Sequence, residues 1–286
     1  MLQNGQGVAA RSSTSSGTAG TPLLKWAGGK RRLLPQLLAL IPERRGRYFE
    51  PFFGGGALFF SLKPRPATLS DANPELIACY QEVRRNPLGV ISHLRNLKND
   101  EESYYRIREE VPTDATKRAA RFLYLTSLAF NGIYRQNLKG EFNVPYGHKA
   151  HLDLPRSLPI LEAAKALRAA KLQCGDFEVV VANAMRGDVI YFDPPYTVAH
   201  GNNGFVKYNS KIFSWDDQKR LSRVARNLAN RGCTVMVSNA DHASILDLYE
   251  SFQVVRIERQ SVIAASSHFR GKTTECVFVR KGKACF

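Results

Sequence analysis

One short stretch limits the folds open to this chain more than any other. The apolar run Val189–Phe192 follows the turn residues Gly187 and Asp188 and leads directly into Asp193-Pro194-Pro195-Tyr196. Four consecutive apolar residues after a turn predict a strand buried on both faces, as in a parallel sheet. In open α/β sheets, ligands bind at the carboxyl ends of such strands. We therefore expect an α/β fold with a binding or catalytic site at residues 193–196.

The same tetrapeptide carries the groups needed to hold a planar amine. Each proline fixes φ at about −65° and lacks an N–H, so the turn is stiff and has few donors of its own. The Asp193 carboxylate and the Pro194 carbonyl suit the two hydrogens of an exocyclic amine, as on adenine N6 or cytosine N4. Tyr196 offers a ring on which a base can stack. The alternative is an ordinary strand-ending turn with a buried tyrosine.

Size and charge narrow the class of partner. A chain of 286 residues with 44% hydrophobic residues fits one large α/β domain, or one domain with an insertion. The 41 Lys and Arg residues exceed the 25 Asp and Glu residues, which gives a net charge of +16. Such an excess favours a polyanionic partner, although a basic protein without one would have the same composition.

The cysteines and the apolar runs point to a cytoplasmic protein. The five cysteines are scattered without a C-x-x-C pair, so neither a disulfide framework nor a metal site is predicted. Reduced thiols are the simple interpretation. No apolar run approaches the length of a membrane span, and the N-terminus lacks the apolar segment of a secretory signal. We expect no metal and no membrane contact.

Periodicity and turn residues predict the order of the elements. Residues 1–21 are rich in Ser, Thr, Gly and Ala and are predicted to be a disordered tail. Helical spacing is expected at 33–41, 57–60, from Pro74, over much of 87–130, at 157–170 and from Ser214 to Gly232. Residues 131–156 and 197–213 are expected to be loops, the first with a hairpin. Strands are expected at 48–49, 68–71, 189–192 and 234–237, with an antiparallel edge pair at 252–263 and 276–280.

A glycine-rich turn after the first strand predicts a nucleoside site. It reads Glu50-Pro51-Phe52-Phe53-Gly54-Gly55-Gly56, and glycine there lets a ligand approach the backbone. Asp71 ends the next strand, where an acidic residue suits paired ribose hydroxyls. The alternative for Asp71 is a turn or cap before the next helix. The spacing is not G-x-G-x-x-G, which disfavours nicotinamide, and no pyrophosphate is required, so S-adenosylmethionine fits. Gly28-Gly29-Lys30 does not complete a P-loop.

These pieces together closely resemble the Dam family of DNA N6-adenine methyltransferases over residues 22–280. The motifs that carry the resemblance occur in the family's order: residues 24–30, 50–56, Asp71, Asn131-Gly132 with Arg135, 140–147 and 193–196. The resemblance implies a Rossmann-like methyltransferase fold, with a mostly parallel sheet, an antiparallel edge hairpin and an inserted, mainly helical DNA-recognition subdomain. It places the catalytic domain at 22–90 and 165–286 and the recognition subdomain at 91–164.

The resemblance also implies roles for single residues. The catalytic turn is Asp193, Pro194, Pro195 and Tyr196. S-adenosylmethionine would contact Trp26, Lys30, Glu50, Pro51, Phe52, Gly54, Gly56, Asp71 and Asp193. Double-stranded DNA would contact Lys25, Phe130, Asn131, Ile133, Arg135, Asn137, Pro145 and Tyr146. The family commonly modifies GATC, but Phe130 stands where many relatives have tyrosine, so this chain departs from the family in the segment that reads DNA.

The residues also say what the reaction needs. A sulfonium methyl group is already electrophilic, so the protein mainly has to position two reactants. The target base must leave the duplex, because N6 is out of reach inside it. No cysteine follows a proline, which disfavours C5-cytosine chemistry. N4-cytosine or RNA-adenine methylation, and a catalytically silent DNA-binding relative, remain alternatives. A DNA substrate implies a nucleoid-associated protein of a bacterial or phage-infected cell, with no protein partner required.

Overall fold

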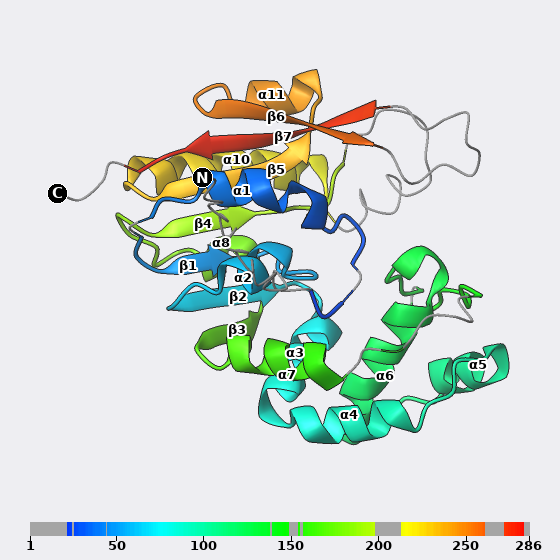
Figure 1. Ribbon diagram of the computed structural model, residues 1–286. Helices are drawn as coiled ribbons and strands as arrows, with labels where there is room; N and C mark the ends of the chain where they lie inside the picture. The colour runs from blue at the N-terminus through cyan, green and yellow to red at the C-terminus, as the bar shows by residue number, and fades with distance from the viewer. Residues whose placement is uncertain are drawn as a thin grey trace, which may run out of the picture.

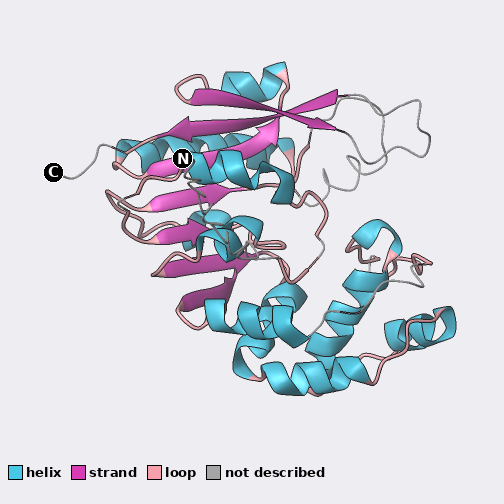
Figure 2. Ribbon diagram, in the orientation of Figure 1, coloured by secondary structure: helices cyan, strands magenta, loops and turns pink. Residues whose placement is uncertain are grey.

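The computed structural model describes residues 22–24, 26–43, 45–137, 139–148, 154, 157–197, 213–260 and 272–282. The expected tail at 1–21, Lys25 and most of the expected loop at 197–213 lie outside these residues. Helices cover both faces of a single sheet, and a group of helices lies beside one end of it (Figures 1 and 2). None of the described helices is long and apolar enough to cross a membrane.

The sheet has the mostly parallel order that the sequence predicts. Its seven strands lie in the order β3-β2-β1-β4-β5-β7-β6. Strands β1 to β5 pair in parallel, whereas β7 runs antiparallel between β5 and β6. The antiparallel pair at the edge is therefore confirmed. The bounds are β1 Tyr48–Glu50, β2 Ala67–Asp71, β3 Ala170–Cys174, β4 Val189–Phe192, β5 Thr234–Ala240, β6 Gln253–Gln260 and β7 Lys272–Arg280.

Strand β4 shows why the apolar run folds as it does. All four of its residues are buried. Val189 and Tyr191 join the core on one face of the sheet, and Ile190 and Phe192 join the core on the other. Because successive strand side chains point to opposite faces, a continuous apolar run is what a strand covered on both sides requires. The predicted buried parallel strand is confirmed, and Asp193 follows at its carboxyl end.

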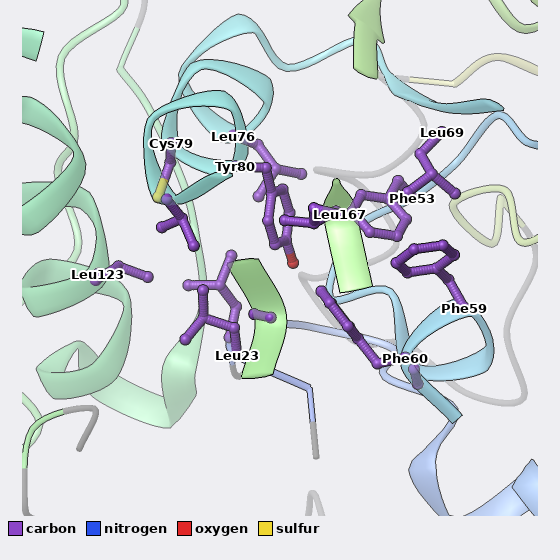
Figure 3. Packing of buried hydrophobic residues seen from close by; sticks show 14 of the residues in the cluster. Leu23, Phe53, Phe59, Phe60, Leu69, Leu76, Cys79, Tyr80, Leu123 and Leu167 are labelled. Atoms are coloured by element: carbon purple, nitrogen blue, oxygen red, sulfur yellow. The ribbon is translucent and has the colours of Figure 1, made fainter. Parts of the chain in front are cut away.

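Two layers of helices supply these cores. One face packs against α1 Leu34–Leu40, α2 Ala57–Leu62 and α3 Pro74–Arg85, and the other against α8 Phe177–Val180, α10 Trp215–Asn230 and α11 Ala243–Leu248. The expected helix start at Ser214 is confirmed as a capping box with Asp217, which satisfies orphan backbone N–H groups. In the first core, Tyr80 of α3 packs on Phe53, their ring centroids 4.8 Å apart (Figure 3).

The remaining helices form a group beside the β3 end of the sheet, which we call the helical lobe. It comprises α4 Pro87–Arg95, α5 Glu101–Glu109, α6 Ala115–Leu128 and α7 Ser157–Leu167 (Figure 1). Helix α6 packs against α4, α5 and the sheet-covering helix α3. Residues 129–147 follow α6 as an irregular segment held by two antiparallel bridges, Ala129↔Tyr146 and Gln136↔Phe142. The expected hairpin is present, and the expected domain limits of 91–164 remain a prediction.

Three elements differ from the sequence expectation. The helix expected at 157–170 ends at Leu167, and strand β3 begins at Ala170. Leu172 of β3 is buried while Lys171 is exposed, so the strand alternates, but its five residues were too short to separate from the helix before it. The short helices α8 and α11 were also not predicted. Each has six residues or fewer, below the length at which helical periodicity is readable.

Candidate active site

A buried lysine ties the catalytic turn to the N-terminal segment. Lys30 is 5% exposed, and its Nζ lies 2.9 Å from Asp193 Oδ1 and 3.7 Å from Glu275 Oε2. The ammonium also donates to the Gly28 carbonyl at 2.9 Å and lies 4.7 Å from the centre of the Tyr196 ring. Burial alone lowers the pKa of Lys30, but pairing with the two carboxylates overrides this and raises the pKa. Lys30 is therefore a fixed positive charge at the strand ends.

The turn 193–196 is held at three points along its length. Asp193 is fixed by Lys30, as above. The Pro195 carbonyl accepts a hydrogen bond from Gln218 Nε2 at 3.3 Å, and Gln218 in turn accepts from Asn239 Nδ2 at 2.9 Å. The Tyr196 hydroxyl donates to Glu275 Oε2 at 3.0 Å. The sequence predicted a stiff turn from its prolines, and the structure adds buried polar partners from α10, β5 and β7.

The glycine-rich turn lies directly against Trp26. Gly54 has a φ of +46°, and a Cβ built there would lie 2.7 Å from Trp26 Cδ1. A Cβ at Gly56, whose φ is +64°, would collide with the Phe53 ring at 2.4 Å. Only glycine fits both the backbone conformation and the space at these two positions. The Gly54 carbonyl accepts from the buried Tyr80 hydroxyl at 3.0 Å, which anchors the turn to α3.

Asp71 joins the two turns at the ends of β1 and β2. Its Oδ2 accepts from the Gly54 N–H at 2.9 Å, and its Oδ1 accepts from the Asn73 N–H at 3.0 Å. The second bond is the turn before α3 that the sequence offered as an alternative for Asp71, while Asn73 itself caps the helix. Burial raises the pKa of Asp71 despite these donors. Each carboxylate oxygen has more than one acceptor site, so these bonds leave room for a ligand hydroxyl.

Glu50 is a second buried carboxyl at the same edge. It is 2% exposed, and its Oε2 accepts from the Tyr48 hydroxyl at 2.7 Å. Burial is the main cause that raises the pKa of Glu50 to about 8, and the negative charge of Asp193 adds to it. Glu50, Asp71 and Asp193 end the adjacent strands β1, β2 and β4. The edge thus concentrates acidic groups, and Lys30 is paired with one of them.

Aromatic side chains line the other side of these strand ends. Phe52 is half-buried, and its ring stacks on Phe177 with centroids 5.4 Å apart. It also contacts Phe192 and Phe213 edge-on, at 6.3 and 5.5 Å. Pro51, which precedes Phe52, is buried. A half-exposed ring beside acidic strand ends is suited to stack against a planar heterocycle.

Trp26 links this edge to the segment after α6. Its ring stacks on Tyr134 at 5.4 Å and on Phe122 of α6 at 6.3 Å. Tyr134 packs in turn on Phe142 across the hairpin. Trp26, which lies against the glycine turn, is therefore also part of the aromatic cluster that packs on the hairpin. The glycine turn and the hairpin are connected through this side chain.

The predicted DNA-contacting residues lie on that hairpin, mostly at its surface. Phe130 is 51% exposed, although it is a large apolar residue, and Asn131 is exposed with a φ of +55°. Ile133 is half-buried and Pro145 is exposed. Arg135 is exposed, and its Nε and Nη2 donate to the side-chain and backbone oxygens of Asn143 at 2.9 and 3.3 Å.

The remaining candidates differ in how far they reach the surface. Asn137 is half-buried and orders the tip of the hairpin, since its side chain donates to Glu141 and accepts from two backbone N–H groups. Tyr146 is 6% exposed and donates to Asn99, so the structure places it in the packing of the lobe and not at the surface. Arg121 of α6 has a charge that would suit a DNA phosphate, but its side chain donates to the backbone carbonyls of Ile107 and Arg108. Tyr146 and Arg121 are thus engaged within the helical lobe, and Lys25 lies outside the described residues.

Several residues of the site were missed from the sequence. Tyr48, Gln218 and Glu275 all bond to the catalytic or glycine turns, and none was a candidate. Glu275 is the one with a usable signal, because it is an acidic residue at the start of the otherwise apolar strand segment Cys276–Val279. A charge in a buried strand requires a partner. The partner, Lys30, lies near the other end of the chain.

Comparison with known proteins agrees with this geometry. The model of one family, described as D12 class N6 adenine-specific DNA methyltransferase, matches residues 26–263. The Type II methyltransferase M1.LlaDCHI of Lactococcus lactis subsp. cremoris is 39% identical over 271 residues, which cover 91% of this chain and 95% of the relative. The DNA adenine methylase of Salmonella typhi is 33% identical over 260 residues, covering 88% and 92%.

Two further likenesses differ in extent. The DNA N-6-adenine-methyltransferase of Escherichia phage P1 is 34% identical over 258 residues, which cover 87% of this chain and 34% of the phage protein. The solved structure of a precorrin-6y C5,15-methyltransferase from Geobacter metallireducens matches 88% of this chain and 87% of its own, at 7% identity and a TM-score of 0.35. That score is too low to relate the two sites. The sequence matches run along nearly the whole described chain.

Proposed function

Because the chain belongs to the D12 class N6 adenine-specific DNA methyltransferases, we propose that it moves a methyl group from S-adenosylmethionine to N6 of a flipped-out adenine at a specific site in duplex DNA. The family gives the reaction and the substrate class, namely N6 methylation of adenine in DNA. The donor, the flipping of the base and the target sequence are our proposal. One observation carries it: the turn 193–196 is fixed at three points beside the acidic strand ends.

The donor fits the edge formed by β2, β1 and β4. S-adenosylmethionine supplies an electrophilic methyl group on a positively charged sulfur. The carboxylates of Asp71 and Asp193 give that edge the negative charge that suits a sulfonium and an ammonium group. Glu50, whose pKa is about 8, would add a further negative charge once it loses its proton. The half-exposed ring of Phe52 suits the adenine, and Asp71 suits the ribose hydroxyls. Gly54 and Gly56 allow close approach, while Trp26, Lys30 and Pro51 shape the walls.

The catalytic turn would bind the amino group of the target base. The Asp193 carboxylate and the Pro194 carbonyl accept the two N6 hydrogens, which favours a more tetrahedral, nucleophilic nitrogen and stabilises the positive charge that grows on it. The Pro195 carbonyl already accepts a hydrogen bond from Gln218. We therefore assign the Pro194 carbonyl as the second acceptor for the amino group, beside the Asp193 carboxylate. Tyr196 is held by Glu275 and stacks on the base. Lys30 keeps Asp193 charged and in place.

The hairpin after α6 would recognise the site. Phe130 is exposed and apolar, as a side chain that fills the gap left by an extruded base must be. Asn131 and Ile133 flank it. Arg135 is exposed and carries a planar guanidinium that can bind the edge of a guanine with two hydrogen bonds. Pro145 can pack on a thymine methyl group. These contacts fit GATC as the target.

The arrangement also supports the domain assignment. Residues 22–90 and 165–286 include the sheet and its strand ends, and residues 91–164 include the hairpin and most of the helical lobe, although the proposed limits fall inside α4 and α7 (Figure 1). A DNA substrate places the protein where the genome is, in the nucleoid of a bacterial or phage-infected cell. No partner protein is needed for any of these steps.

Sequencing of modified bases tests the proposal directly. We would express the chain in a bacterial host that lacks adenine methylation and map N6-methyladenine and N4-methylcytosine in its DNA, with Asp193→Ala as the control. We expect N6-methyladenine at GATC and none in the control. Methylcytosine would contradict the choice of base, another methylated sequence would contradict the target, and unmodified DNA with intact DNA binding would favour a silent binding protein. Methyl transfer in vitro that does not depend on added S-adenosylmethionine would contradict the donor.

A further inference from the structure

The edge of the sheet opposite the catalytic turn carries a row of basic residues. Parallel strands begin at that edge, and each is preceded by at least one basic side chain: Arg45 and Arg47 before β1, Lys63 and Arg65 before β2, Arg168 before β3, Arg186 before β4 and Arg231 before β5. Strand β7 is antiparallel, so it ends at the same edge, with Arg280 and Lys281. In Figure 1 this edge lies at the left, away from the helical lobe. We call it the basic edge.

Backbone contacts show that these segments are neighbours. The Tyr48 N–H donates to the Pro66 carbonyl at 3.0 Å, which joins the entries to β1 and β2. Gly46 donates to Gly187 at 2.8 Å, and Gly187 donates to Gly232 at 3.1 Å, which continues the row to the entries of β4 and β5. Since neighbouring strands lie about 4.8 Å apart, the row extends across the width of the sheet.

The side chains in the row are held on this frame. Arg47 pairs with the buried Asp188 and donates to the Asn183 carbonyl at 2.7 Å. Arg231 donates to the Ala182 carbonyl at 3.0 Å. Arg186 packs against Gly232, where a Cβ would lie 3.1 Å from its Cγ. The row is therefore a feature of the rigid sheet and not a set of unrelated surface charges.

The charge of the row is largely uncompensated. Arg45, Lys63, Arg65, Arg186 and Arg231 are exposed, and none of them forms an ion pair within the part of the chain that the structure describes. Some exposed basic residues outside the row are compensated by acidic neighbours. On α10, Lys219 pairs with Asp216, and Arg220 bridges three acidic residues. A linear, unpaired basic row on a rigid frame matches the regularly spaced charges of a polyanion.

One duplex cannot serve both edges of the sheet. Strand β5 has seven residues at about 3.3 Å each, so the two edges lie roughly 20 Å apart through the protein. A duplex seated at the catalytic turn and the hairpin lies on the far side from the basic edge (Figure 1). A nucleic acid bound at the basic edge is therefore a separate segment.

We propose that the basic edge binds the phosphate backbone of a second segment of duplex DNA, without sequence preference, while the catalytic edge holds the target. The inference rests on the proposed function only for the identity of the polyanion as DNA. A second binding surface of this kind would keep the protein bound to DNA between encounters with its target. Each phosphate contact adds about 0.9 to the slope of log affinity against log salt, so the row has a measurable signature.

The test compares two fourfold variants with the same net charge. The first combines Arg45→Gln, Arg65→Gln, Arg186→Gln and Arg231→Gln. The matched control combines Arg95→Gln, Lys117→Gln, Lys219→Gln and Arg223→Gln, exposed positions on α4, α6 and α10 that are not part of the row. Each protein is saturated with a short GATC duplex and then titrated with a differently labelled duplex that lacks the target, and binding is followed by sedimentation velocity.

We expect the wild type and the control to bind both duplexes. The basic-edge variant should bind the second duplex at least about tenfold more weakly at 100 mM salt, with a salt slope smaller by about 3.6 if all four arginines contact phosphates. Its single-turnover methylation of the short duplex should stay within about twofold of the wild type. Equal loss in both variants, or no loss in the basic-edge variant, would overturn the proposal. So would capture of inorganic polyphosphate but not of duplex DNA.

Unfolding of the variant and failure of the proposed function can each be distinguished from a failure of this proposal. If the fourfold variant unfolds, Arg65→Glu changes one exposed side chain and should weaken capture of the second duplex by itself. Failure of the proposed function has a different appearance, because the wild type would then leave the short duplex unmethylated whether or not a second duplex is bound.

Discussion

The edge of the sheet that we propose to be catalytic and the hairpin that we propose to read DNA are built in opposite ways. At the catalytic edge, Lys30, Glu50 and Glu275 are buried, and each reacting turn is fixed by partners from several elements. On the hairpin, Phe130, Arg135 and Pro145 are exposed, and two isolated bridges hold the backbone. Methyl transfer depends on positioning, which a packed sheet provides. Recognition depends on side chains that can be exchanged without disturbing a core, which a surface hairpin provides.

The contact between the two regions is narrow and aromatic. The Trp26 side chain lies against the glycine turn, and its ring also stacks on Tyr134 of the hairpin. A shift of the hairpin on binding DNA would therefore move Trp26 and change its packing against the glycine turn. If the contrast between the regions is correct, substitutions at the catalytic edge should change chemistry and stability together, whereas substitutions on the hairpin should change specificity alone.

Asp193→Ala should have the largest effect. It removes one of the two acceptors for the amino group, and we expect the rate of methyl transfer to fall by about 10⁴-fold, more than about 5 kcal/mol of transition-state stabilisation. Single-turnover incorporation of labelled methyl groups into a GATC duplex measures this. Asp216→Ala, at an exposed position on α10, is the control. Transfer at more than a tenth of the wild-type rate would remove Asp193 from the reaction.

Lys30→Met tests the buried charges of the same edge. It leaves the carboxylates of Asp193 and Glu275 without their counter-ion, and breaking a buried pair in this way typically costs about 3–5 kcal/mol. We expect the free energy of unfolding, measured with denaturant, to fall by about 3 kcal/mol. Arg135→Met on the hairpin should change it by less than about 0.5 kcal/mol. Equal losses would show that the two regions do not differ in how they are held.

Glu50 makes the stability of the catalytic edge depend on pH. Its pKa is about 8 in the folded protein, above the ordinary 4.5, because burial disfavours the charged form. Between these values the folded state holds a proton that the unfolded state has lost, so stability falls as the pH rises from about 5 to 8. We expect a loss of about 3 kcal/mol over that range, measured by denaturant unfolding at several pH values.

Glu50→Gln is the matched variant for that measurement. It keeps the side-chain volume and an acceptor for the Tyr48 hydroxyl, but it cannot ionise. The fall in stability from pH 5 to 8 should therefore become much smaller in the variant. The buried Asp71, whose pKa is also raised, contributes a remainder of the same sign. An unchanged pH profile would mean that Glu50 does not titrate in this range.

The same contrast explains what the sequence could predict. The strands, the glycine turn and the turn 193–196 could be predicted from short local patterns. A strand buried on both faces requires a continuous apolar run, and a left-handed backbone favours glycine. The partners that fix these turns did not. Gln218 and Glu275 reach the catalytic turn through tertiary packing, and a single sequence does not record which distant residues meet. Tyr146 belonged to the right motif, but its burial could not be read from it.

Arg135→Ala should have the smallest effect and the most specific one. Losing a guanine contact costs about 1.5 kcal/mol, roughly a tenfold change, and only for the sequence that the contact reads. We expect kcat/KM for GATC to fall by about that factor, while the values for duplexes altered at the guanine stay nearly constant. The preference of the enzyme for GATC over these altered duplexes should therefore decrease. Stability should not change, because the guanidinium is exposed and bonds within the hairpin. Arg135→Lys keeps the charge and loses the planar fork, so it should lose the preference as well. If Arg135→Ala instead lowers kcat/KM equally for every duplex and Arg135→Lys restores it, the residue contacts phosphate, and the hairpin positions the duplex at this point without reading it.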